Sequence, residues 1–182
     1  PFLFFVPPLA WGILPWLALV PAAAAGYTRK LFERPDVRFA SCWFLFPFLF
    51  FSASEGKIAT YILPVFPPLV YLVAVGLAGY IESGRRRLLT SGSALFAVVT
   101  GGASVVLMLS QFTEALGFRI YEDAEASKIL FLAGGLFAWA LVLVFAICAK
   151  HAWRLLALYC AAPVVMMFAT HFMFPVEFEG KK

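Results

Sequence analysis

Charged residues are scarce in this sequence. Only 13% of its 182 residues are charged, whereas 63% are hydrophobic and the mean hydropathy is +0.92. Ordinary soluble domains are about 45–50% apolar and about 25% charged. The scarcity of charge therefore excludes an ordinary water-soluble domain and predicts a protein that is surrounded mainly by lipid.

Cysteine and histidine, which build disulfides and many metal sites, are also rare. Cys42, Cys148 and Cys160 all fall inside apolar stretches, where a thiol usually acts as a small buried hydrophobe. We assign these cysteines no chemistry. His151 and His171 fall near opposite ends of the last apolar stretch, so they cannot share a metal site within this chain.

An initiator methionine is absent as well. The sequence begins at Pro1, without a basic leader or a signal-type cleavage site. We therefore interpret the first apolar stretch as a mature membrane span, and we expect the chain to start inside a longer protein.

Long apolar stretches dominate what is present. A helix needs roughly 20 apolar residues to cross a hydrocarbon core of about 30 Å. The sequence predicts an all-α integral membrane protein with about six transmembrane helices in a single transmembrane domain, residues 1–182. The spans are expected at residues 2–25, 39–53, 58–79, 93–110, 129–149 and 155–174. The second is short, and prolines in the first and third are expected to kink or unwind them.

The charges predict an orientation. Nine of the fourteen basic residues lie in alternate connecting segments: Arg29, Lys30, Arg34, Arg38, Arg85, Arg86, Arg87, Lys150 and Arg154. A basic excess marks the cytoplasmic face, so both chain ends and the segment 52–57 are expected outside. We interpret the run Arg85–Arg87 as this topology signal with contact to membrane lipids, rather than as a nucleic-acid site.

One connecting segment, residues 50–64, is rich in polar groups. Lys57 and Tyr61 are four residues apart where the third helix is expected to begin, so on an α-helix they share one face. A cation and a phenol at a helix N-terminus suit a phosphate. The alternative is that Lys57 extends to the lipid interface and Tyr61 belongs to an aromatic belt. The residues alone leave both interpretations open.

The same region carries a family resemblance. The matching segments are Pro1–Pro7, Leu14–Trp16, Trp43–Ser52 and above all Gly56–Pro64. They resemble the bacterial lipid A aminoarabinose transferases and the related dolichyl-phosphate-mannose-protein mannosyltransferases, integral-membrane glycosyltransferases of the GT-C type. Good agreement extends over about residues 1–80, and beyond them only the helix spacing and the closing residues Glu179–Lys181 match. Glu55 and Ala59 depart from the family, which usually has Lys and Pro there.

The resemblance implies a C-terminal fragment of a GT-C bundle in the bacterial inner membrane, with both chain ends periplasmic. Such enzymes transfer a sugar from a polyprenyl-phosphate donor, usually undecaprenyl phosphate, to lipid A or another envelope acceptor. Lys57 and Tyr61 would then lie beside the donor phosphate. The catalytic acidic loop is expected outside this chain, so the fragment should be inactive alone. No cofactor is expected here, and any divalent metal would belong to the missing half.

A different class of function also fits the spans. A transporter or lipid flippase would use kinked helices to line a pathway through the bilayer. Almost no charge falls in the middle of a predicted span, whereas ionisable residues usually mark such pathways. A non-catalytic membrane scaffold is the third alternative.

Overall fold

The computed structural model describes residues 2–55, 58–112, 126–148 and 151–173. Every regular element in these ranges is a helix, which confirms the all-α fold class. The chain divides into two compact units, Pro1–Gly92 and Ser93–Lys182, and each is described by itself.

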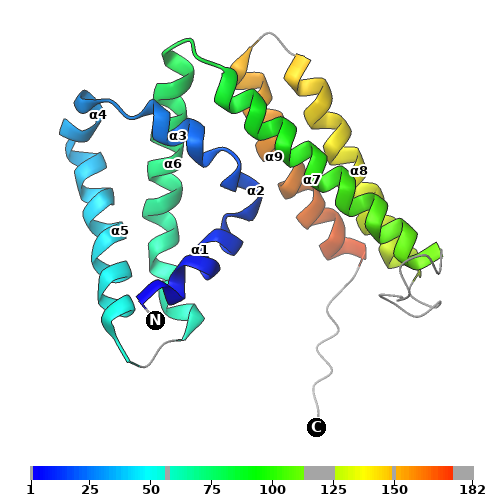
Figure 1. Cartoon of the computed structure of the whole chain (residues 1–182), viewed down its shortest axis with the longest axis horizontal. Helices are drawn as coiled ribbons and strands as arrows, with labels where there is room; N and C mark the ends of the chain where they lie inside the picture. Colours follow the sequence, from blue (N-terminus) through cyan, green and yellow to red (C-terminus); the bar gives the residue numbers. More distant parts are fainter. Residues whose placement is uncertain (1, 56–57, 113–125, 149–150, 174–182) are drawn as a thin grey trace. The chain divides into compact units, whose positions relative to one another are not determined.

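The first apolar block is a series of short helices rather than one continuous span (Figure 1). Each of its three α-helices carries a proline in one of its first two positions. Proline fits the first turn of a helix but breaks the hydrogen-bond ladder of a helix interior. The prolines therefore end one short helix and allow the next to begin. The elements are η1 (Phe2–Phe5), α1 (Val6–Gly12), α2 (Leu14–Leu17) and α3 (Val20–Gly26).

Two long antiparallel helices follow. After the short α4 (Arg29–Glu33), α5 covers Pro35–Ala53, and α6 covers Phe66–Glu82. Helix α5 has 19 residues, four more than the predicted span, because it begins at Pro35. The 3-10 helix η2 (Ala59–Val65) precedes α6, so the predicted third span starts with tighter winding.

Helix α3 lies against α6 at a very close distance. A Cβ atom added to Gly26 would overlap the carbonyl oxygen of Gly76 and lie 2.6 Å from the backbone nitrogen of Tyr80. An added Cβ on Gly79 would lie 2.7 Å from the carbonyl oxygen of Gly26. Small residues permit such backbone approach between membrane helices. These glycines therefore fix the position of α3 on α6.

The second unit contains most of α7 (Arg87–Phe112), together with α8 (Ala126–Cys148) and α9 (Ala152–Met173). Phe96 contacts Trp139 of α8 with a ring-centroid distance of 4.9 Å, and it contacts Tyr159 of α9 at 5.5 Å. The Ser104 hydroxyl donates a hydrogen bond of 2.7 Å to the Ala133 carbonyl oxygen. Three helices therefore share one aromatic core, and a polar link joins two of them.

Several of these helices can cross a membrane. Within the described residues, four helical segments are long and apolar enough, namely Pro35–Ala53, Ala59–Glu82, Arg87–Ser110 and Leu130–Cys148. Residues 152–161 of α9 form a shorter apolar stretch. The fold is therefore that of a multi-pass membrane protein, and the total of six spans stays a prediction.

Candidate functional site

The segment singled out in the sequence forms the turn between α5 and η2. The last turn of α5 is closed by the Ser54 N–H, which donates to the carbonyl oxygens of Phe50 and Phe51 at 3.2 and 3.3 Å. On the other side, the Tyr61 N–H donates to the Ile58 carbonyl oxygen at 3.0 Å. Local hydrogen bonds therefore order both flanks of the turn.

Tyr61 lies on the exposed side of η2. Its side chain is 41% exposed, and its ring packs against Phe51 with a centroid distance of 5.4 Å. Phe51 in turn contacts Phe50 edge to face at 5.3 Å. The hydroxyl makes no hydrogen bond to another residue in the described part of the chain. Tyr61 is therefore held by its ring while its polar end stays available to a ligand.

The other side of η2 is buried. Ile62 and Val65 form a core cluster with Phe5 of η1 and Leu9 of α1. The partly buried residues around this cluster are Phe44, Phe48, Phe51, Phe66 and Leu69. The N-terminal residues thus support η2 from behind, which gives Tyr61 a rigid base.

Lys57, the other predicted site residue, lies outside the described residues, so its pairing with Tyr61 stays a prediction. One premise of that pairing is wrong. The α-helix begins at Phe66, and Tyr61 belongs to a 3-10 helix. That 3-10 helix begins only at Ala59, after Lys57 in the sequence, so α-helical spacing does not relate the two residues. The prolines at 64, 67 and 68 explain the difference, because they disfavour an α-helical ladder before Phe66.

An aromatic stripe runs along α5 and ends near Tyr61. Phe39, Trp43, Phe46 and Phe50 are spaced at three or four residues and are exposed in the structure, Phe46 at 73%. Phe39 contacts Trp43 at 5.9 Å between centroids, and Phe46 stacks on Phe50 at 6.2 Å. The stripe offers a continuous apolar surface from the start of α5 to the site.

A polar network lies at the opposite end of α5. The Arg34 guanidinium donates from Nε and Nη2 to the two carboxylate oxygens of Asp36, at 3.2 and 2.6 Å. Tyr71 of α6 donates its hydroxyl proton to the same carboxylate. The hydrogen bonds to Asp36 raise the pKa of the Arg34 guanidinium. From the sequence, Arg34 is expected only to mark the cytoplasmic face. The network has no local sequence signal, because Tyr71 lies 35 residues from Asp36 in sequence.

The structure contains no candidate metal centre in its described part. No group of three or more His, Cys, Asp or Glu side chains converges among the residues searched. Cys42, Cys148 and Cys160 form no disulfide among the described residues. The expectation about a metal in the rest of the protein is not tested by this chain.

The fold and its apolar helices define a multi-pass α-helical membrane protein. The curated proteins that match it specify the relationship further. The chain is 30% identical over 169 residues to the undecaprenyl phosphate-alpha-4-amino-4-deoxy-L-arabinose arabinosyl transferase of Photorhabdus laumondii. This match covers 92% of the chain and 30% of that protein. The chain is 36% identical over 166 residues to the transferase of that name from Erwinia tasmaniensis, covering 87% and 29% respectively.

A shorter match has a higher identity. Over 74 residues the chain is 45% identical to a transferase of that type from Proteus mirabilis, covering 41% of this chain and 13% of that protein. No family model matches the chain, and the comparison with solved structures gives no significant match.

These similarities confirm the resemblance predicted from the sequence. The chain is a homologue of one segment of the aminoarabinose transferases, and it spans about 30% of the length of the first two relatives. The 169-residue match extends well past residue 80, so the similarity is not confined to the first half of the chain.

Proposed function

We infer that this chain is part of a polyprenyl-phosphate-dependent glycosyltransferase. In this proposal the whole protein transfers a sugar from undecaprenyl phosphate to lipid A or another envelope acceptor, at the periplasmic face of the bacterial inner membrane. The observation that carries the proposal is the similarity to named undecaprenyl-phosphate aminoarabinose transferases over up to 92% of the chain. The activity belongs to the whole protein, and this chain alone is expected to be inactive.

The reaction in this proposal is an inverting displacement. An acidic residue outside this chain takes the proton of the acceptor hydroxyl, and the resulting oxygen attacks the anomeric carbon. The bond between that carbon and the phosphate oxygen breaks, and polyprenyl phosphate leaves with the bonding electrons. Groups that stabilise the negative charge on the leaving phosphate lower the barrier most effectively when they are preorganised.

Lys57 and Tyr61 are our candidates for that stabilisation. Tyr61 supports this role by its geometry, since its ring is fixed on Phe51 and its hydroxyl has no partner among the described residues. A phenol can donate one hydrogen bond to a phosphate oxygen, and a Lys ammonium offers a full positive charge. The aromatic stripe on α5 would accompany the polyprenyl chain of the donor.

The decisive experiment uses the full-length enzyme in membranes. A strain lacking the gene is complemented with wild type or Lys57→Ala, and lipid A and the surface glycans are analysed by mass spectrometry. We expect wild type to restore a sugar modification and Lys57→Ala to lose most of it at equal protein level. Unchanged lipids and glycans in the deletion strain would exclude transferase activity. Near-normal activity of Lys57→Ala would exclude only the site assignment.

A further inference from the structure

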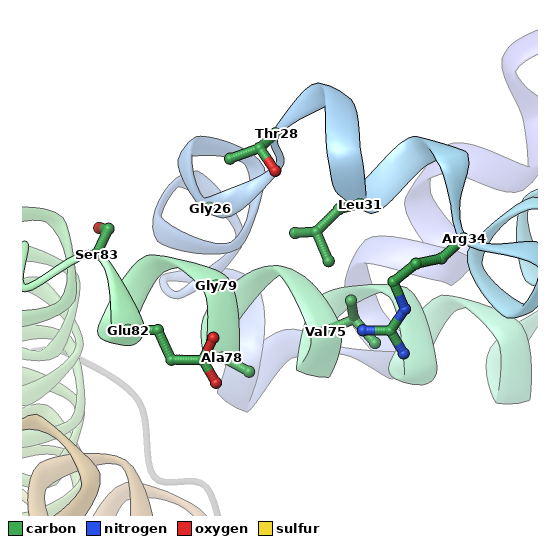
Figure 2. A pocket seen from close by; sticks show the side chains of 9 residues that line it. All are labelled: Gly26, Thr28, Leu31, Arg34, Val75, Ala78, Gly79, Glu82 and Ser83. Carbon is green, nitrogen blue, oxygen red and sulfur yellow. The ribbon is translucent and has the colours of Figure 1, made fainter.

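A cavity lies where α6 ends and the segment after α3 begins. It has a volume of about 400 Å³, and Figure 2 shows the side chains that line it. Pockets for small ligands usually measure about 300–1,000 Å³. The lining residues come from α3 to α4 and from the last two turns of α6: Gly26, Thr28, Leu31, Arg34, Val75, Ala78, Gly79, Glu82 and Ser83. The donor-phosphate proposal does not use this cavity.

The cavity has one basic and one acidic side chain. Figure 2 shows Arg34 beside Val75 and Glu82 beside Ser83, near opposite ends of the lining. Val75 and Glu82 are two helical turns apart on α6, about 10 Å along the axis. The ligand that fits this lining therefore has a negative group and a positive group separated by a short linker.

Arg34 is prepared for an anion. The Asp36 carboxylate accepts from Nε and Nη2, and it is fixed in turn by Tyr71. This uses two of the five N–H donors of a guanidinium and sets the plane of the group. Arginine binds phosphate through several N–H groups of that plane. A phosphate at this end would complete a network that the protein already orders.

Glu82 offers a matching acceptor for a cation. Its carboxylate is exposed and makes no ion pair or hydrogen bond with another side chain in the part of the chain that the structure describes. Thr28 and Ser83 also line the cavity, and the Ser83 hydroxyl donates to the Tyr80 carbonyl oxygen at 2.7 Å and accepts from Arg85 Nε at 2.8 Å. A carboxylate is a suitable acceptor for a primary ammonium, which carries three N–H donors.

The apolar part of the lining points to a lipid. Tyr71, Val75, Ala78 and Glu82 follow the spacing of one face of α6. Val75 and Ala78 make that face apolar between Tyr71, whose hydroxyl binds Asp36, and Glu82, where the spanning segment Ala59–Glu82 ends. The cavity is therefore at the level of lipid headgroups, and a chain attached to the ligand could follow this face toward the middle of the bilayer.

We propose that this cavity binds a phospholipid whose headgroup carries both a phosphate and a primary ammonium, as in phosphatidylethanolamine. Arg34 binds the phosphate, and Glu82 binds the ammonium. A phosphatidylglycerol headgroup leaves Glu82 without a cation. A choline headgroup has no N–H to donate.

The experiment is a lipid titration of the full-length protein in mild detergent, followed by native mass spectrometry. The probes are phosphatidylethanolamine, phosphatidylcholine, phosphatidylglycerol and water-soluble glycerophosphoethanolamine. We expect wild type to bind phosphatidylethanolamine about tenfold more tightly than the other two lipids. This ratio is what one charged hydrogen bond usually contributes to affinity. Glycerophosphoethanolamine should bind much more weakly. Equal binding of the three lipids would overturn the proposal, and so would equally tight binding of the soluble headgroup.

Single substitutions test whether the lipid binds in this cavity. Glu82→Gln should remove the preference for ethanolamine over choline, and Ala78→Phe should fill the cavity and lower retention of every probe. Arg29→Ala is the matched control, because the Arg29 side chain is 96% exposed, forms an ion pair with Glu33 and does not line the cavity. Wild-type lipid selectivity in both Glu82→Gln and Ala78→Phe would overturn the assignment. The readout is lipid binding, so it is independent of transferase activity.

Discussion

The Tyr27 hydroxyl donates a hydrogen bond of 2.7 Å to the backbone carbonyl oxygen of Leu72, across 45 residues of sequence. It joins the segment after α3 to the middle of α6, beside the close approach of Gly26 and Gly76. Burial, followed by the nearby Tyr71, raises the pKa of this phenol, so it remains a neutral donor at physiological pH. The contact therefore helps to hold the broken first block on α6.

Removing this hydroxyl should lower stability modestly. Tyr27→Phe keeps the ring and deletes one half-buried hydrogen bond, which usually contributes about 1 kcal/mol. We expect a lower midpoint of thermal unfolding for the detergent-solubilised protein. Tyr61→Phe is the control, because its hydroxyl has no partner in the described residues. Equal midpoints for wild type and Tyr27→Phe would show that the bond contributes nothing.

Gly76 should tolerate no side chain. A Cβ atom there would overlap the carbonyl oxygen of Ala23 and lie 2.7 Å from a ring carbon of Tyr27. Because both neighbouring backbones are helical, relief requires separation of α3 from α6. We expect Gly76→Ala to destabilise the protein by at least about 2 kcal/mol, as overpacking usually does.

Gly102 provides the comparison for that substitution. An added Cβ there meets nothing within 4 Å. Gly102→Ala should leave stability unchanged or raise it by up to about 1 kcal/mol through helix propensity. Thermal unfolding of both variants in one detergent tests the difference. Similar midpoints would contradict the packing of α3 on α6.

The sequence was sufficient to predict the membrane class and most of the helices. Long apolar stretches cannot be accommodated in water, so α5, α7, α8 and α9 cover the predicted spans and begin a few residues earlier, whereas α6 begins later than the predicted third span, after η2. The prolines of the first block predict kinks or unwinding, but they do not predict that the block divides into separate short helices. Proline patterns alone do not tell a kinked span from a series of short helices.

The remaining features depend on contacts between distant residues. The pairing of Gly26 with Gly76, and of Asp36 with Tyr71, has no local sequence signal. The pairing of Lys57 with Tyr61 was predicted from α-helical spacing. Spacing alone does not reveal that Tyr61 lies on the 3-10 helix η2.

Tyr61 should matter for transfer and little for folding. If its hydroxyl binds the donor phosphate, Tyr61→Phe in the full-length enzyme loses one charged hydrogen bond, and kcat/KM should fall roughly tenfold to a hundredfold. Leu63→Ala is the control, since Leu63 is exposed on the same helix and has no polar group. Assays with a polyprenyl-phosphate sugar and lipid A measure both variants. A Tyr61→Phe enzyme as active as wild type would remove this residue from the site.

Glu55 should weaken the affinity for the donor. It stands where the resembling transferases usually have Lys, two residues from Lys57, and its negative charge opposes phosphate binding. We expect Glu55→Lys to lower the KM for the donor severalfold, with the larger effect at low salt because exposed charges are screened. Glu33→Lys, on α4, should leave the KM unchanged. A higher KM for Glu55→Lys would contradict a phosphate beside this turn.

The hydrogen bond from Ser104 to Ala133 should stabilise the second unit. It joins α7 to α8 at 2.7 Å and is buried, whereas the Ser110 hydroxyl bonds to Leu107 within its own helix. Hydrogen bonds between membrane helices contribute about 0.6–2 kcal/mol. Ser104→Ala should therefore lower the unfolding midpoint more than Ser110→Ala does. The two substitutions delete the same atom from one helix, so the difference between them isolates the interhelical bond. Equal midpoints would mean that α7 and α8 are held together by apolar packing alone.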